Sequence, residues 1–169
     1  MTQSLHDFRA RGASKPRPPV LPVSGARPPV VRFKDADETV NNSNTLQNDN
    51  DLVIPVGVNQ VWWIEFHLVY NSGATPDIQF AVTVPSGSTL GLRGIGGNAA
   101  GTLVENHTVT SGGGLAFQGT GANRLLTLEC WISVSTTPGY AQLQWAQNTA
   151  NVSDTTVLAG SHLLAWQIR

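Results

Sequence analysis

The sequence predicts an all-β protein, namely an antiparallel, jelly-roll-like β-sandwich with an extended N-terminal arm. From Thr39 onward, short runs rich in Val, Ile, Thr, Trp and Phe are separated by Gly, Pro, Asn and Asp, which is the pattern of strands and turns. No stretch has the periodicity of an amphipathic helix. Six of the ten prolines lie within residues 1–34, where they exclude helix and central strand. We therefore divide the 169 residues into an arm, 1–38, and a sandwich, 39–169.

The arm is strongly basic. Residues 1–34 hold seven of the ten Lys and Arg residues and a single acid, Asp7, so their net charge is +6. Such a segment lacks a core of its own and is either a solvated linker or a strap held by another molecule. Phosphate binding would suit the charge, but Pro and Val separate the basic residues, which favours docking into grooves of a protein over specific nucleic-acid binding. The expected contact residues are Arg9, Arg11, Lys15, Arg17, Val20, Leu21, Arg27, Val30, Val31, Arg32, Phe33 and Lys34.

The strongest strand signal is the run VWWIEFHLVY at 61–70. Its period of two places five large residues on one face, which we expect to be the core: Trp62, Ile64, Phe66, Leu68 and Tyr70. The run DIQFAVTV at 77–84 alternates in the same way, and the turn residues between the two runs predict that they pair as a hairpin.

Further strands are expected along the rest of the sandwich, at 52–56, 88–93, 102–110, 114–119, 124–134, 140–147, 155–160 and 162–169. The glycine-rich segments 94–101 and 111–114 are interpreted as long turns. Nine or ten short strands favour a sandwich or jelly roll over a fold of alternating strands and helices.

The sandwich carries little charge and has apolar residues on both faces of some strands. Only ten of the residues 39–169 are charged, whereas soluble domains average about a quarter. Leu125 and Trp131 lie opposite the core face of their strand, and Trp63 does so in 61–70. These three residues predict a contact surface between copies of a homo-oligomer. The alternative is that loops of the same chain cover them.

Residue patterns typical of catalysis, metals or cofactors are weak, so we expect no enzyme, metal site or cofactor. The histidines His6, His67, His107 and His162 are widely spaced. Glu105 and His107 share a strand face, which is common in period-two sequences. Cys130 lies in an apolar strand and is expected to be an inert core thiol. The glycines at 94–97 are not followed by a helix that could hold a phosphate.

Three segments of the sandwich are distinctive, namely TVNNSNTLQNDNDLVIPV at 39–56, LVYNSGATPDIQFAVTVPSG at 68–87 and LQWAQNTANVSDTTVLAGSHLLAWQI at 143–168. These segments resemble a β-rich module of tailed-bacteriophage virion proteins. The module occurs in head decoration (cement) proteins, head fibres and minor tail proteins. The resemblance implies a structural virion protein, a trimer, without enzymatic activity.

Two virion roles and one other role follow as hypotheses. The first is a decoration protein on the outer surface of the capsid, with the arm bound to the major capsid protein. The second is a minor tail or fibre protein with a receptor- or carbohydrate-binding β-sandwich. The third is a carbohydrate-binding module, for which the sequence offers five tryptophans, Trp62, Trp63, Trp131, Trp145 and Trp166. No apolar run reaches the length of about 18 residues needed for a membrane span, so no membrane partner is expected.

Overall fold

The computed structural model describes residues 28–169, and these residues form strands but no helix. The expected fold class, an antiparallel β-sandwich, is confirmed. The strands are β1 (Val30–Phe33), β2 (Glu38–Val40), β3 (Gln47–Val56), β4 (Val61–Ser72), β5 (Ile78–Thr83), β6 (Thr89–Gly97), β7 (Leu103–Thr108), β8 (Leu115–Phe117), β9 (Arg124–Ser133), β10 (Gly139–Gln147), β11 (Thr155–Val157) and β12 (His162–Gln167). Within the described range, no helix is long and apolar enough to cross a membrane.

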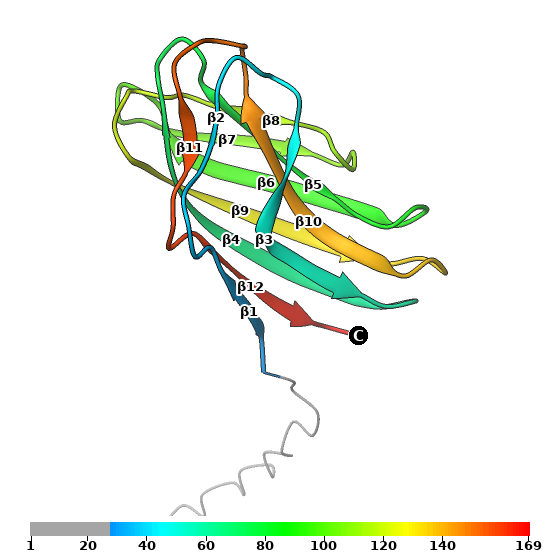
Figure 1. Cartoon of the computed structure of the whole chain (residues 1–169). Coiled ribbons are helices and arrows are strands. Elements are labelled where there is room, and N and C mark those ends of the chain that lie inside the picture. Colours follow the sequence, from blue (N-terminus) through cyan, green and yellow to red (C-terminus); the bar gives the residue numbers. More distant parts are fainter. Residues whose placement is uncertain (1–27) are drawn as a thin grey trace, which may run out of the picture.

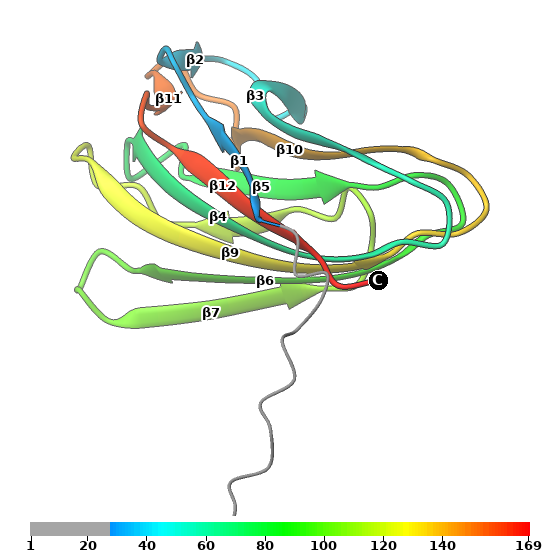
Figure 2. The same cartoon turned by 90° about the horizontal axis from the view of Figure 1, so that it is seen from below.

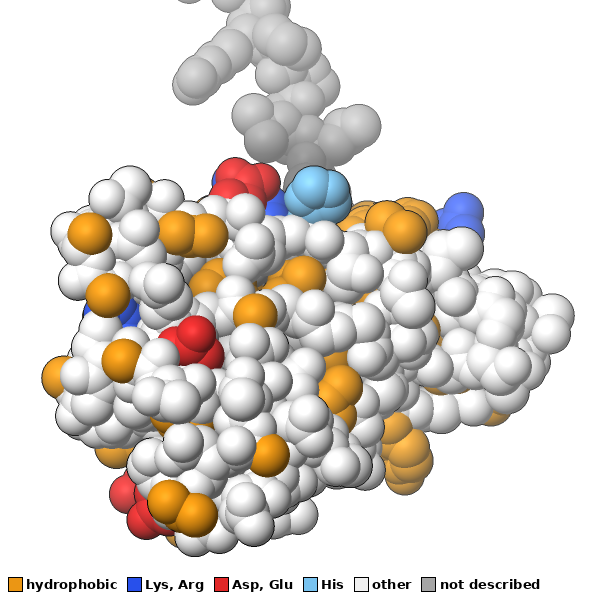
Figure 3. All heavy atoms as spheres, turned by 90° about the horizontal axis from the view of Figure 1, so that it is seen from above, with side chains coloured by type: hydrophobic (Ala, Val, Ile, Leu, Met, Phe, Trp, Pro, Cys, Tyr) orange, Lys and Arg blue, Asp and Glu red, His pale blue; other side chains and the backbone are white. Residues whose placement is uncertain are grey.

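The strands form two layers (Figures 1 and 2). The large sheet has the order β1-β12-β4-β9-β6-β7, and β11 joins β2 to the end of β4. The small sheet has the order β3-β10-β5-β8. We call the side of the large sheet that faces away from the small sheet the outer face. The loop end seen from above carries few charged side chains (Figure 3), in keeping with the composition of the sandwich.

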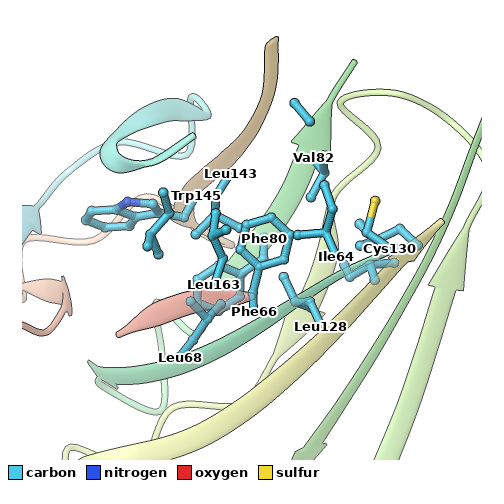
Figure 4. Close-up of a cluster of buried hydrophobic side chains, with 14 of the residues drawn as sticks. Ile64, Phe66, Leu68, Phe80, Val82, Leu128, Cys130, Leu143, Trp145 and Leu163 are labelled. Atoms are coloured by element: carbon cyan, nitrogen blue, oxygen red, sulfur yellow. The ribbon is translucent and has the colours of Figure 1, made fainter. Parts of the chain in front are cut away.

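The core lies between the two sheets (Figure 4). The expected core face of β4 is confirmed, since Ile64, Phe66, Leu68 and Tyr70 are at most 1% exposed and Trp62 is 6% exposed. Phe80 of β5 meets Tyr70 edge to face, with ring centroids 5.8 Å apart. Cys130 is also fully buried, as expected.

The expected hairpin between 61–70 and 77–84 is wrong. β4 pairs with β9, β12 and β11 in the large sheet, whereas β5 pairs with β10 and β8 in the small sheet. The turn after β4 therefore carries the chain across the core. Both strands present alternating apolar faces because they face each other through that core.

The expected turn at 94–101 is also partly wrong, because 94–97 continue β6. Gly94 and Gly96 face the core, and a Cβ atom at Gly94 would lie 2.5 Å from Phe117 Cζ and 2.8 Å from Leu128 Cδ2. These glycines leave room for Phe117 to pack between the sheets. The turn itself begins at Asn98.

The sandwich begins earlier than expected. Residues 30–33, assigned to the arm from sequence, form the edge strand β1, which runs antiparallel to β12 from Val30 opposite Ala165 to Phe33 opposite His162. β2 begins at Glu38, the last residue of the expected arm, and pairs with β11. An edge strand tolerates the prolines that precede β1, because one side of it has no ladder to complete. The boundary at residue 38 therefore moves to the start of β1.

Candidate functional site

The structure describes only the end of the expected capsid-binding arm. The side chains of Arg9, Arg11, Lys15, Arg17, Val20, Leu21 and Arg27 lie outside the described residues. The described part, Val30–Lys34, is the arm root, by which we mean β1 and the lysine that follows it.

The arm root presents one side to the sandwich and one to its surroundings. Val30 packs against the core. Val31, Arg32 and Phe33 are exposed, Phe33 by 59%. The expectation that all five residues contact another protein is thus revised for Val30 and Lys34, whose side chains serve this chain's own fold. It stays a prediction for the other three.

Lys34 is the most unusual residue of the arm root, because its charged side chain is completely buried. Its Nζ lies 2.9 Å from Asp49 Oδ2, 3.0 Å from Glu38 Oε1 and 3.7 Å from Asp51 Oδ2. Its backbone N–H donates to Ser161 O, and its carbonyl accepts from Gly160 N–H. We call Lys34, Glu38, Asp49 and Asp51 the buried charge cluster. It ties the arm root to β3 of the small sheet.

The three carboxylates of this cluster lie close enough to hold a cation, with ligand atoms within 4.8 Å of one another. The Lys34 ammonium already occupies the space between them. Asp49 is held in place within β3, where its Oδ1 accepts hydrogen bonds from the backbone N–H groups of Asp51 and Leu52. The arrangement therefore acts as an internal ion-pair lock.

The structure places the three predicted interface residues at two separate positions on the outer face. Trp63 and Trp131 are direct partners across β4 and β9, and both lie on the outer face. Trp166 of β12 is the next partner of Trp63, so three indoles follow one another across three strands. Leu125, 76% exposed, lies six residues before Trp131 on β9, about 20 Å away at roughly 3.4 Å per residue. That copies meet at either place stays a prediction.

Charged residues form the next row of the outer face. Arg93 binds both oxygens of Glu105, at 2.8 Å and 3.1 Å, and donates to Glu129 Oε2 at 3.0 Å. Glu129 is the cross-strand partner of Glu65, whose Oε1 accepts a hydrogen bond from Trp63 Nε1 at 3.0 Å. The guanidinium of Arg93 lowers the pKa of the Glu105 carboxyl, and the hydrogen bonds to Glu105 and Glu129 raise that of Arg93.

Two shallow depressions flank these rows. One, of about 260 Å³, lies beside Trp63 and Trp131 and is bordered by Arg93, Val109 and Glu129. The other, of about 330 Å³, runs past Glu105 and His107 towards Ala116 of β8. Both are open to solvent.

The residues that the sequence offered for chemistry are placed as follows. Glu105 and His107 do share a face of β7, but the Glu105 carboxylate is engaged by Arg93. His67 and His162 stack on the outer face with ring centroids 5.0 Å apart, and Phe33 lies next to His162. Burial raises the pKa of the Cys130 thiol. His6 lies outside the described residues.

Sequence reasoning missed the buried charge cluster and the alignment of Trp166 with Trp63 and Trp131 across three strands. Asp49 and Asp51 stand two residues apart in β3, a spacing that places both side chains on one face of a regular strand and was a signal that they act together. Nothing in the local sequence indicated that Lys34, 15 residues before Asp49, is its ion-pair partner. The strand register that brings Trp166 beside Trp63 had no local signal either.

No family model matches the sequence, and no curated protein does so either. Among solved structures, similarity is found to capsid protein VP2 of infectious bursal disease virus. A mutant VP2 in T=1 particles is 12% identical, with a TM-score of 0.20 over 84% of this chain and 40% of that chain. The VP2 subviral particle is 12% identical, with a TM-score of 0.22 over 85% and 42%. This chain thus spans less than half the length of those proteins, and TM-scores this low do not establish a shared fold.

Proposed function

We propose that this protein is a structural virion protein that decorates the outer surface of a phage head. In this proposal the basic arm binds the major capsid protein and the sandwich projects from the shell. The proposal rests on the charge of the arm, on the segments that resemble the phage virion module, and on the way in which the arm root joins the sandwich.

The observation that carries the proposal is the anchoring of the arm root. β1 is hydrogen-bonded along β12, and directly after it Lys34 is locked to Asp49 inside the protein. A force on the arm would therefore pass into the sandwich through a strand ladder and a buried ion pair, rather than through a loose linker. This construction suits a protein that must stay attached while its body projects.

Most of the basic residues that remain to bind a partner precede the arm root in the sequence. Arg32 is exposed and Lys34 is used internally, which leaves five basic residues in 1–27 and Arg32 beside them. Val31 and Phe33 supply exposed apolar surface next to these charges. Acidic grooves with apolar pockets on the shell would complement such a strap.

A homotrimer would strengthen this attachment. Three arms joined in one assembly raise the effective concentration of each arm at the shell, so weak single contacts give a stable complex. The expected contact surface includes Leu125, which is exposed on β9 and borders the same depression as His67 and His162.

The test is co-sedimentation of the full chain with empty shells of a phage that carries it. Changing the five basic residues of 1–27 to Gln is expected to leave the protein folded, to move it from the pellet to the supernatant, and to flatten the salt dependence of binding. Arg169→Gln, at an exposed position of the sandwich, is the control and should bind like the parent protein.

A second variant separates attachment from folding. A chain that lacks residues 1–27 keeps β1 and Lys34, so it should unfold like the parent protein and fail to bind shells. Equal pelleting of all variants contradicts the proposal. A protein found in a few copies per particle, rather than in many, supports the tail or fibre role instead.

A further inference from the structure

The outer face carries an aromatic strip, which we define as Trp166, Trp63 and Trp131. The three residues are successive cross-strand partners on β12, β4 and β9, and neighbouring strands lie about 4.8 Å apart. The three indoles therefore lie in one row that crosses the strands on the outer face. Trp131 is 42% exposed, whereas Trp62 and Trp145 are buried in the core.

The surface next to the strip is open at its Trp131 end. Gly91 of β6 is the next partner after Trp131, and a Cβ atom built on Gly91 would meet no atom within 4 Å. The depression of about 260 Å³ lies at this end, with Val109 as its far wall. The missing side chain at Gly91 thus leaves one flank of Trp131 uncovered.

A row of polar groups runs parallel to the strip, two residues away from Trp63, Trp131 and Gly91 on their strands. It consists of Glu65, Glu129 and Arg93, which are also successive cross-strand partners. Arg93 has five N–H groups, of which three are used on Glu105 and Glu129. Each carboxylate oxygen can accept more than one hydrogen bond, so the row offers both donors and acceptors to a ligand on the strip.

The combination of indoles with neighbouring carboxylates differs from the usual composition at the centre of a protein–protein interface. Interface centres are depleted in Glu and Asp, because burying these groups costs desolvation energy. Here Glu129 borders the same depression as Trp131, and Glu65 is hydrogen-bonded to Trp63. A ligand that stacks on the indoles must therefore also satisfy carboxylates at its edge.

A pyranose ring meets both demands, since one face of the ring presents C–H groups and its rim presents hydroxyls that donate and accept. The charge of the row and its neighbour Glu105 argues for a neutral sugar: two glutamates of the row and Glu105 beside it outnumber the single Arg93, and like charges repel an anionic glycan. We propose that the aromatic strip and the row beside it bind a neutral oligosaccharide. This proposal goes beyond attachment to the shell and does not depend on it.

The test is an NMR titration of the full chain with maltoheptaose, cellohexaose and chitohexaose, with a heparin hexasaccharide as the anionic probe. At least one neutral probe is expected to shift the indole N–H signals of Trp63, Trp131 and Trp166. The signals of the buried Trp62 and Trp145 serve as internal references and should not move. The anionic probe should bind more weakly than the best neutral one.

Two variants assign the site. Trp131→Ala is expected to weaken binding on the order of tenfold, because it removes one stacking surface. Gly91→Phe is expected to weaken binding by covering the open flank of Trp131, at a position where a Cβ atom meets no atom within 4 Å. Tyr140→Ala is the matched control, because Tyr140 is an exposed aromatic residue of the small sheet.

Three results would overturn the proposal. The first is that no neutral probe shifts the three signals at millimolar concentration. The second is that Tyr140→Ala weakens binding as much as Trp131→Ala. The third is that Trp131→Ala lowers the mass of an oligomer in sedimentation velocity while no saccharide binds, which would identify the strip as a contact between copies of this chain.

Discussion

Two regions of this protein gather the same kinds of charge around one cation, and they differ mainly in burial. In the buried charge cluster, Lys34 meets Asp49, Glu38 and Asp51 with no exposure of the lysine side chain. On the outer face, Arg93 meets Glu105 and Glu129, and the Arg93 side chain is 45% exposed. The two shortest distances are nearly the same in both groups, 2.9 and 3.0 Å around Lys34 and 2.8 and 3.0 Å around Arg93.

Burial gives these two groups of residues different tasks. In the interior, water cannot replace a missing partner, so removing one charge leaves the other uncompensated. At the surface, water and salt screen the same attraction, and its loss changes little. We therefore assign the Lys34 group to the fold of the arm root and the Arg93 group to the chemistry of the outer face.

The largest effect is expected from Asp49→Ala. This change removes the closest partner of Lys34 and also the acceptor for the backbone N–H groups of Asp51 and Leu52. We expect a loss of about 4 to 5 kcal/mol in the free energy of unfolding, measured by urea denaturation. Phe66→Ala is the apolar reference, with an expected cost of about 3 to 5 kcal/mol in the core.

If Asp49→Ala does not fold, Asp49→Asn provides the measurement. It keeps an oxygen for the two backbone donors and removes only the charge, so its cost should be smaller. A loss of less than about 1 kcal/mol in either variant would show that Lys34 finds another partner or reaches water.

A somewhat smaller effect is expected from Lys34→Met, which keeps an apolar stem and removes the ammonium. The buried Asp49 carboxylate is left without its cation but keeps its hydrogen bonds from two backbone N–H groups, and the carboxylates of Glu38 and Asp51 are partly exposed and can be hydrated. We therefore expect a loss of about 3 kcal/mol. Hydrogen exchange of the β1 amides should also become faster, because the arm root loses its lock. Arg32→Met, at the exposed neighbour, should change neither quantity. Equal effects of the two substitutions would contradict the assignment.

The sequence was sufficient to predict the core face of β4 and the direction of several side chains. A period of two separates Phe66 from Trp63 without any knowledge of the neighbouring strand, and the structure confirms both positions. It could not show which sheet a strand joins, because β4 and β5 present the same alternating pattern to one core. The hairpin was predicted for that reason.

The arm boundary and the rows of side chains on the outer face depend on contacts between residues that are distant in the sequence. Composition assigned Val30 and Lys34 to a basic, proline-rich segment, and only the pairing with β12 and with Asp49 places them in the sandwich. Gly94 looked like a turn residue, although its role is to admit Phe117 to the core. Such roles arise from register and packing, which a local pattern does not contain.

The smallest effect on stability is expected from Arg93→Gln, which completes the comparison. Arg93 lowers the pKa of the Glu105 carboxyl in the folded protein. The ion pair therefore stabilises the folded protein at pH values above 4.5, the ordinary pKa of glutamate. This stabilisation is lost as the pH falls through the lowered pKa of Glu105. In Arg93→Gln the Glu105 carboxyl should titrate at a higher pH by NMR, while the urea midpoint at neutral pH should hardly move. A large drop in that midpoint would show that the exposed group, like the buried one, holds the fold together.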